Sequence, residues 1–156
     1  MERIGYTLYK MNKQRKTKMK TLTIKQKPYT RFGKTYEHDI EMVNGKPKYQ
    51  AKIAKDGSEI TLFGETEVYG NYGGQRQYRP YSVTFKLGDS AEYDSYNLIY
   101  LGTITKITEK AVTIVAYHGT RNAETHRLDL YKFARKNYKF DLEKIQKHNS
   151  EERMYI

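Results

Sequence analysis

The chain has 156 residues and a formal net charge of +11 at pH 7, and its length suits one domain with a short tail. It contains no cysteine, which excludes disulfides and thiolate metal sites, and it has no run of about 18 apolar residues that could span a membrane. The N-terminus lacks the apolar core of a secretion signal, so we expect a cytoplasmic protein with no membrane partner.

The positive charge is concentrated near the N-terminus. Residues 1–35 hold 11 Lys or Arg and a single acid, whereas residues 36–156 hold 18 Lys or Arg and 17 Asp or Glu. Residues 1–20 therefore predict a flexible basic arm, which either follows the phosphates of a nucleic acid or is a solvated tail without a partner. Its candidate binding residues are Lys13, Arg15, Lys16, Lys18 and Lys20.

Residues 21–156 predict a single β-rich domain, in which residues 21–117 form an antiparallel meander. Alternating and β-branched stretches mark the expected strands at Thr21–Gln26, Tyr36–Val43, Lys48–Ala54, Ser58–Phe63 and Tyr81–Lys86. Asn44-Gly45 is the strongest short hairpin signal in the chain. Turns at intervals of about ten residues are typical of a small barrel or sandwich.

The stretch Gly64–Pro80 interrupts the strand pattern with glycines, tyrosines and arginines. Tyrosine rings can stack on bases and arginine can contact phosphate, which is the chemistry of a loop that binds single strands. The alternative is a flexible hairpin extension whose tyrosines pack back on the sheet. The candidate binding residues in this stretch are Tyr69, Tyr72, Arg76, Tyr78 and Arg79.

Residues 102–115 form the clearest local unit, a β-hairpin that turns at Glu109-Lys110. We expect Ile107 to lie opposite Val112 and Thr105 to lie opposite Ile114. A Gly-Asp turn, a loop and this hairpin together resemble the general pattern of small SH3-like barrels over residues 81–117. The resemblance implies a closed barrel or a strongly bent sheet.

After residue 125 the apolar period changes from that of a strand to that of a helix. In the stretch Arg127–Tyr138 the apolar residues Leu130, Phe133, Ala134 and Tyr138 fall at helical spacing. The basic outer face of this helix supplies four candidate binding residues, Lys132, Arg135, Lys136 and Lys139. Asp141 predicts the N-cap of a second short helix, so that residues 126–149 would hold one or two C-terminal helices over the sheet.

Catalytic and cofactor motifs are weak throughout the sequence. His118 and His126 bracket a polar loop, but their spacing matches no metal pattern and loop histidines are usually solvated. Glu37, Asp39 and Glu41 would share one face of a strand, where a solvent-facing acidic stripe is the simplest interpretation. The sequence therefore predicts no catalytic residue, no metal and no cofactor.

The fold prediction is a mainly β (α+β) domain, a small antiparallel SH3-like or related β-barrel or bent sheet with one or two C-terminal helices. The leading functional hypothesis is a non-enzymatic protein that binds DNA or RNA, with single strands favoured. The alternative is a protein-interaction module, such as an adaptor or an inhibitor of a host enzyme from a phage or plasmid.

Overall fold

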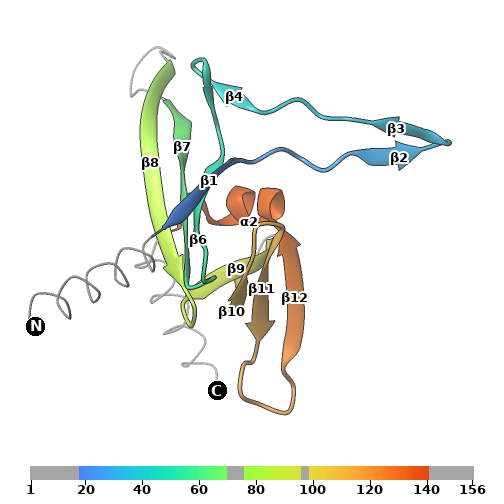
Figure 1. Ribbon diagram of the computed structural model, residues 1–156, viewed down its shortest axis with the longest axis vertical. Helices are drawn as coiled ribbons and strands as arrows, with labels where there is room; N and C mark the ends of the chain where they lie inside the picture. Colours follow the sequence, from blue (N-terminus) through green and yellow to red (C-terminus); the bar gives the residue numbers. More distant parts are fainter. Residues whose placement is uncertain (1–17, 70–75, 96–98, 141–156) are drawn as a thin grey trace, which may run out of the picture.

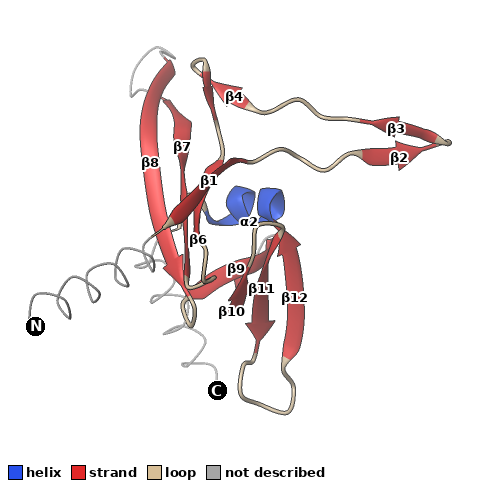
Figure 2. Ribbon diagram, viewed as in Figure 1, coloured by secondary structure: helices blue, strands red, loops and turns tan. Residues whose placement is uncertain are grey.

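The computed structural model describes residues 18–69, 76–95 and 99–140. This part of the chain is mainly β, with two four-stranded antiparallel sheets, two short hairpins and one helix, α2 (Leu130–Asn137). Together the sheets form a curled half-barrel, with α2 in the angle between them (Figures 1 and 2). The predicted fold class, a β-rich domain with a bent sheet and a C-terminal helix, is confirmed.

The first sheet has the strand order β1-β6-β7-β8. Its strands are β1 (Met19–Thr23), β6 (Gln50–Ala54), β7 (Glu59–Tyr69) and β8 (Arg76–Lys86). The expected alternation in β6 and the residue before it is confirmed, because Tyr49, Ala51 and Ile53 are all buried. All neighbours in this sheet are antiparallel.

The expected break at Gly64 was wrong, because β7 and β8 remain paired from Glu59↔Lys86 out to Tyr69↔Arg76. A side chain at Gly64 would clash with the backbone carbonyl of Lys48. This glycine therefore marks a close backbone approach within a strand and not the start of a loop. The residues between the two strands, 70–75, lie outside the described part of the chain.

The second sheet has the order β12-β11-β10-β9. Its strands are β9 (Ser90–Ser95), β10 (Ile99–Ile107), β11 (Ala111–Ala116) and β12 (Glu124–Asp129). The expected hairpin is present, with Ile107 opposite Val112, but Ile104 and not Thr105 lies opposite Ile114. The reason is a bulge between Ile104 and Lys106, which takes Thr105 out of register.

Strand β12 is a further correction, because the sequence placed residues from Arg127 onward in a helix. His126 and Leu128 alternate with exposed neighbours and pair with Ile114 and Val112 of β11. The helix begins only at Leu130, where the Asp129 carboxylate accepts a hydrogen bond from Lys132 N at 2.8 Å as the N-cap. The second C-terminal helix expected after Asp141 lies outside the described residues.

Another correction concerns the expected strand Tyr36–Val43, which instead contributes to two separate hairpins. One hairpin pairs β2 (Tyr29–Arg31) with β3 (Lys34–Tyr36), and the other pairs β4 (Met42–Val43) with β5 (Lys46–Pro47) around the predicted Asn44-Gly45 turn. The acids at 37–41 therefore do not share one face of a strand. We call residues 29–36 the ribbon. It stands well away from the body of the molecule (Figure 1).

The hydrophobic core lies between the two sheets and is closed by α2. Its largest fully buried side chains come from β7, β8, β10, β11 and α2, and they are Ile60, Leu62, Phe85, Ile104, Val112, Ile114 and Phe133. Phe85 packs edge-on against Phe133, with 5.3 Å between the ring centroids. The predicted inward face of the helix is confirmed, since Leu130, Phe133 and Ala134 are buried.

Helix α2 is tied to the edge strand β9 by Asn137, a fully buried polar residue. Its side-chain oxygen accepts a hydrogen bond from Glu92 N at 2.8 Å, and its side-chain nitrogen donates to Glu92 O at 3.0 Å. The side chain thus pairs with β9 as a neighbouring strand would. It does so beside a bulge, where Tyr100 pairs with Asp94 and Leu101 with Glu92, so that Tyr93 has no partner in β10.

Tyrosines at both ends of α2 pack against tyrosines of the first sheet and of the residue before β6. The rings of Tyr49, Tyr81, Tyr131 and Tyr138 meet edge to face, with centroid distances of 5.3–5.8 Å. The Tyr81 hydroxyl also donates a 2.6 Å hydrogen bond to Lys48 O. Burial raises the pKa of Tyr49 and of Tyr81 above the usual tyrosine value, because the phenolate would be poorly solvated there.

Replacing Asn137 should destabilise the fold. Asn137→Leu keeps similar bulk but leaves the backbone N–H and C=O of Glu92 unpaired, so we expect a loss of about 1–3 kcal/mol in the free energy of unfolding. Urea denaturation followed by circular dichroism measures the loss. Asn122→Ala, in the exposed β11–β12 loop, is the control and should change stability little; equal losses in both variants would refute the role of Asn137.

Stability should fall at alkaline pH. In the unfolded chain Tyr49 and Tyr81 ionise at about pH 10, whereas their raised pKa values keep them protonated while the protein is folded. Their contribution is complete below about pH 10 and is lost above it, at up to about 1.4 kcal/mol per pH unit for each group. Urea unfolding at pH 9–11.5 should show a shallower decline for Tyr49→Phe than for the wild type; identical slopes would contradict the assignment.

Candidate nucleic-acid interface

A groove of about 1040 Å³, lined by described residues, lies beside the base of the ribbon. Its walls come from the segment leading into β2, from β9, from β12 and from the outer face of α2. The cationic residues that line it are Lys27, Arg127, Lys132, Arg135 and Lys136. Three carboxylates, Glu92, Asp94 and Asp129, also line it, so that the groove is mixed in charge with an excess of cations.

Two segments, residues 24–28 and 37–41, connect the ribbon to the body, and each is held by hydrogen bonds at the end nearest the body. On the outgoing side Ile24 is buried and its backbone N–H donates to Tyr49 O at 3.0 Å. On the returning side the Tyr131 hydroxyl donates to a Glu41 carboxylate oxygen at 2.9 Å, and Lys48 N donates to Glu41 O at 2.8 Å. Burial, and then the bond to Glu41, raises the pKa of Tyr131. These contacts fix the ribbon wall of the groove.

The helix wall follows from the amphipathic pattern of α2. Because Leu130, Phe133 and Ala134 face the core, Lys132, Arg135 and Lys136 fall on the opposite face of the helix. Lys132 and Arg135 are exposed and Lys136 is half-buried, and all three line the groove. Two of these cations lie in the last turn of the helix, where they interact favourably with its carbonyl end.

The sheet wall carries an aromatic pair next to Arg127. Tyr93, the residue bulged out of β9, stacks on His126 of β12 with 4.2 Å between ring centroids and 19° between ring planes. Burial is the main cause of the raised pKa of Tyr93. His126 also lies 3.5 Å from a Glu124 carboxylate oxygen. The groove therefore combines cations that could contact phosphates with an aromatic surface that could contact bases or sugars.

The described residues are positive as a whole, with 21 Lys or Arg against 13 Asp or Glu. Part of this charge comes from residues 18–35, which hold six Lys or Arg and no acid. The predicted flexible arm, residues 1–20, includes only two of these six cations, Lys18 and Lys20. The structure places the six at β1, on the segment that follows it and on the ribbon.

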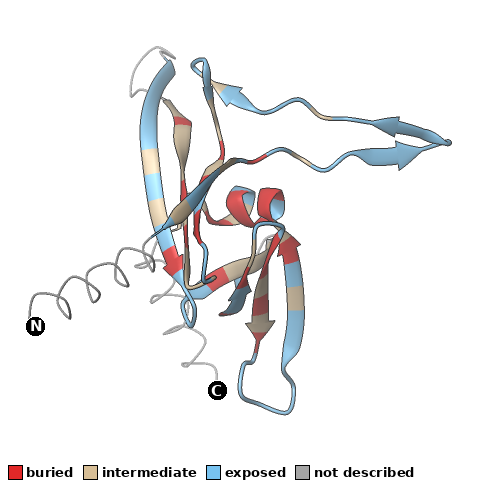
Figure 3. Ribbon diagram, viewed as in Figure 1, coloured by how far each residue is buried: buried red, intermediate tan, exposed pale blue. Residues whose placement is uncertain are grey.

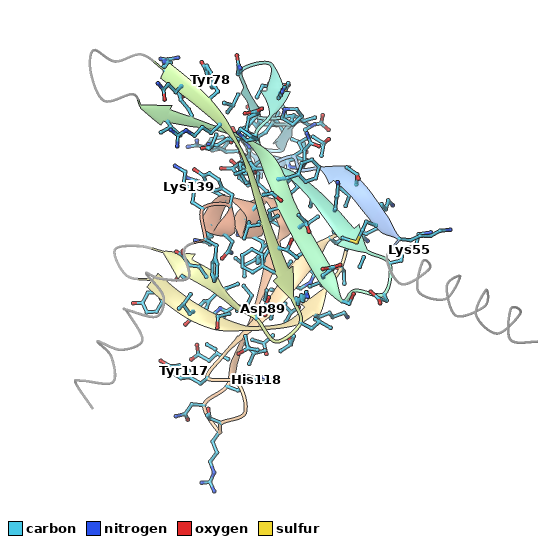
Figure 4. All side chains as sticks on the ribbon, turned by 90° about the vertical axis from the view of Figure 1, so that its left-hand side faces the viewer. Lys55, Tyr78, Asp89, Tyr117, His118 and Lys139 are labelled. Atoms are coloured by element: carbon cyan, nitrogen blue, oxygen red, sulfur yellow. The ribbon has the colours of Figure 1, made fainter. Side chains whose placement is uncertain are left out.

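Three of the four helix residues predicted to bind line the groove, namely Lys132, Arg135 and Lys136. The fourth, Lys139, lies outside it, with its ammonium 5.3 Å from the centre of the Tyr138 ring. Figure 4 shows Lys139 beside α2 and Tyr78 near the outer end of β8. The structure thus gathers part of the predicted helix face into one site.

The predicted tyrosine and arginine positions do not join this site. Arg76, Tyr78 and Arg79 lie on the outer half of β8, which is on the opposite side of the molecule from the ribbon (Figure 1). Arg76 is ion-paired with Glu67 at 3.1 Å, and Tyr78 is 38% exposed. Tyr69 ends β7, and Tyr72 lies outside the described residues. None of the residues that the structure describes here lines the groove.

The residues predicted in the basic arm are only partly described. Lys13, Arg15 and Lys16 lie outside the described range. Lys18 and Lys20 belong to the start of the first sheet, where Lys18 O accepts a hydrogen bond from Lys55 N and Lys20 forms a 3.0 Å ion pair with Glu109. Lys20 therefore links β1 to the β10–β11 turn and is engaged within the fold.

Sequence reasoning missed Lys27, Arg127 and Tyr93 as site residues. Arg127 was assigned to a helix. Tyr93 reaches the groove because of a bulge that no local sequence pattern predicts. Lys27 precedes Pro28-Tyr29, and a Lys-Pro-Tyr sequence before a symmetric Tyr-Thr-Arg-Phe-Gly-Lys-Thr-Tyr stretch is the signal that could have indicated a hairpin. The missed cations come from elements other than α2, so only the fold brings them together.

The described residues contain no cluster of three or more His, Cys, Asp or Glu that could hold a metal ion. No helix among them is both long enough and apolar enough to cross a membrane. No protein-family model, no curated protein and no solved structure matches the chain, so the resemblance of residues 81–117 to SH3-like barrels stays a prediction.

Proposed function

We propose that this chain is a non-enzymatic, cytoplasmic protein that binds DNA or RNA through the groove beside the ribbon. The observation that carries the proposal is the convergence of five cations from three separate elements on one concave surface. Surface cations scattered for solubility have no reason to gather in this way, whereas a groove that follows a phosphate backbone requires it.

The aromatic pair on the sheet wall supports the same function. Tyr93 and His126 are already stacked on each other, so a base or sugar could extend the stack without ordering a flexible loop. Tyr29 lines the outer part of the groove and is itself stacked on Tyr36 at 5.2 Å. Phosphate contacts at the walls and aromatic contacts between them are the usual division of roles in nucleic-acid recognition.

A protein partner is the second candidate, and the ribbon favours it. Apolar and aromatic residues are exposed on the ribbon and on the segment that follows it as far as β4. They are Tyr29, Phe32, Tyr36, Ile40 and Met42. Exposed apolar residues on a projecting hairpin are a feature of interaction surfaces. The cationic groove has no role in that function, which is why we place nucleic acid first.

Removing the helix cations should weaken binding and make it less dependent on salt. A triple variant should bind labelled duplex DNA, single-stranded DNA or RNA about tenfold or more weakly than the wild type. It combines Lys132→Gln, Arg135→Gln and Lys136→Gln. The slope of log K against log salt should become shallower by about 2–3 for a duplex, because fewer counterions are released. Fluorescence anisotropy at several salt concentrations measures both quantities.

The matched control removes three exposed lysines that do not line the groove. This second triple variant, Lys55→Gln with Lys86→Gln and Lys106→Gln, lowers the net charge by as much as the first does. It should keep most of the wild-type affinity. If the two triple variants bind equally, net charge and not the groove causes binding. If the wild-type protein binds none of the three probes at physiological salt, the proposal is refuted and the protein-partner function takes its place.

A further inference from the structure

The tip of the ribbon carries a bulky aromatic residue in a conformation that such residues avoid. Phe32 has φ 53° and Gly33 has φ 74°, so both lie in the left-handed region. The Asn44-Gly45 turn adopts nearly the same values, 53° and 76°. Asparagine and glycine tolerate this conformation, whereas a phenylalanine there is strained. The same chain therefore contains the ordinary version of this turn and a version with an unfavourable residue.

Nothing among the described residues explains the choice of phenylalanine at this position. The Phe32 ring is 91% exposed, and the contact it makes is with the neighbouring Arg31, whose guanidinium lies 5.3 Å from the ring centre. All six strand residues of the ribbon are exposed as well (Figure 3). Strained residues that the core does not need are concentrated at functional sites, so we expect Phe32 to contact a binding partner.

The ribbon is built to present this ring firmly. Its strands pair in register as Tyr29↔Tyr36, Thr30↔Thr35 and Arg31↔Lys34. The Tyr29 and Tyr36 rings stack at 5.2 Å, and the two threonine hydroxyls lie 3.4 Å apart across the strands. The ring therefore stands at the end of a braced two-stranded hairpin.

The charge around the tip favours an anionic partner. Arg31 and Lys34 flank the Phe32-Gly33 turn, and no acid occurs between residues 18 and 36. A two-stranded ribbon fits the groove of a nucleic-acid duplex, and proteins that bend DNA insert apolar side chains between base steps. A single ring between two cations suits such insertion better than it suits an apolar protein pocket, which would have to bury the two charges.

We propose that the ribbon enters a groove of duplex DNA and that Phe32 inserts between adjacent base pairs while Arg31 and Lys34 contact the flanking phosphates. This inference rests on the proposed nucleic-acid function and specifies its substrate as a duplex. Tyr29 connects the two surfaces, because it pairs within the ribbon and also lines the cationic groove. A duplex held by the ribbon is thereby brought alongside the groove.

The test uses Phe32→Asn in the full chain, because asparagine already occupies the equivalent turn position at residue 44. The fold should be retained, with a melting temperature equal to or above that of the wild type. The matched control is Tyr117→Asn, which replaces the other strongly exposed aromatic in a left-handed conformation, with φ 54° and 67% exposure. Tyr117 lies in the β11–β12 loop, away from the ribbon (Figures 1 and 4).

Two measurements report on insertion. Anisotropy with a labelled 30-base-pair duplex and a 30-nucleotide single strand gives the affinities, and relaxation of a closed plasmid by topoisomerase in the presence of protein reports unwinding caused by an inserted ring. The wild type and Tyr117→Asn should shift the plasmid's linking number. Phe32→Asn should abolish the shift and weaken duplex binding about tenfold.

The outcomes separate this inference from the proposed function. If Phe32→Asn binds the duplex and shifts the linking number like the wild type, the insertion is refuted while nucleic-acid binding stands. Binding of the wild type to the single strand alone has the same consequence. If the wild type binds neither probe, the insertion fails, and the proposed function fails with it unless RNA is bound. Loss of a self-associated species in Phe32→Asn, measured by light scattering without DNA, would then assign the tip to a protein contact.

Discussion

The pairing of the Asn137 side chain with the backbone of Glu92 fixes one end of α2, and the arrangement of the site depends on where this helix lies. Edge strands normally leave backbone groups unpaired, and here a helix residue satisfies them. At the other end of the helix, the Tyr131 hydroxyl holds Glu41 at the base of the ribbon. One short helix thus sets the spacing between the second sheet and the ribbon, and the groove is the space between them.

The abundance of tyrosine has a structural explanation in the tyrosine cluster formed by Tyr49, Tyr81, Tyr131 and Tyr138. Each ring contributes apolar area, and the hydroxyls of Tyr81 and Tyr131 reach polar groups that a phenylalanine would leave unpaired. Lys48 extends over two of these rings, at 5.2 Å from Tyr49 and 5.7 Å from Tyr138. Tyrosine frequency alone is therefore weak evidence for a binding surface in this chain.

The sequence predicted those features that depend on neighbouring residues. The Asn44-Gly45 turn, the pairing of Ile107 with Val112 and the inward face of α2 each follow from local periodicity or turn chemistry. The sequence did not predict features that depend on distant contacts. Gly64 lies in a strand because Lys48 passes close to it, and β12 is a strand because β11 offers a free edge.

The ribbon escaped prediction for a different reason, since its own turn breaks the local rule. A Phe-Gly dipeptide is not a recognised hairpin signal, because phenylalanine resists positive φ. Here the flanking strands and their stacked tyrosines hold it in place. A position at which local preference fails while the surrounding structure is regular is where a functional constraint is expected. Phe32 is such a position.

Only part of the candidate site could be predicted, because its cations come from segments that are far apart in the sequence. The helical spacing of Lys132, Arg135 and Lys136 was visible, whereas Lys27 and Arg127 join them only through the fold. This arrangement has an energetic consequence. Cations on a capped helix, a paired strand and an anchored segment lose less conformational entropy on meeting phosphates than cations on a free tail. Fixed positions of this kind also define a direction for the bound backbone, and that direction leads from α2 to Tyr29 at the start of the ribbon.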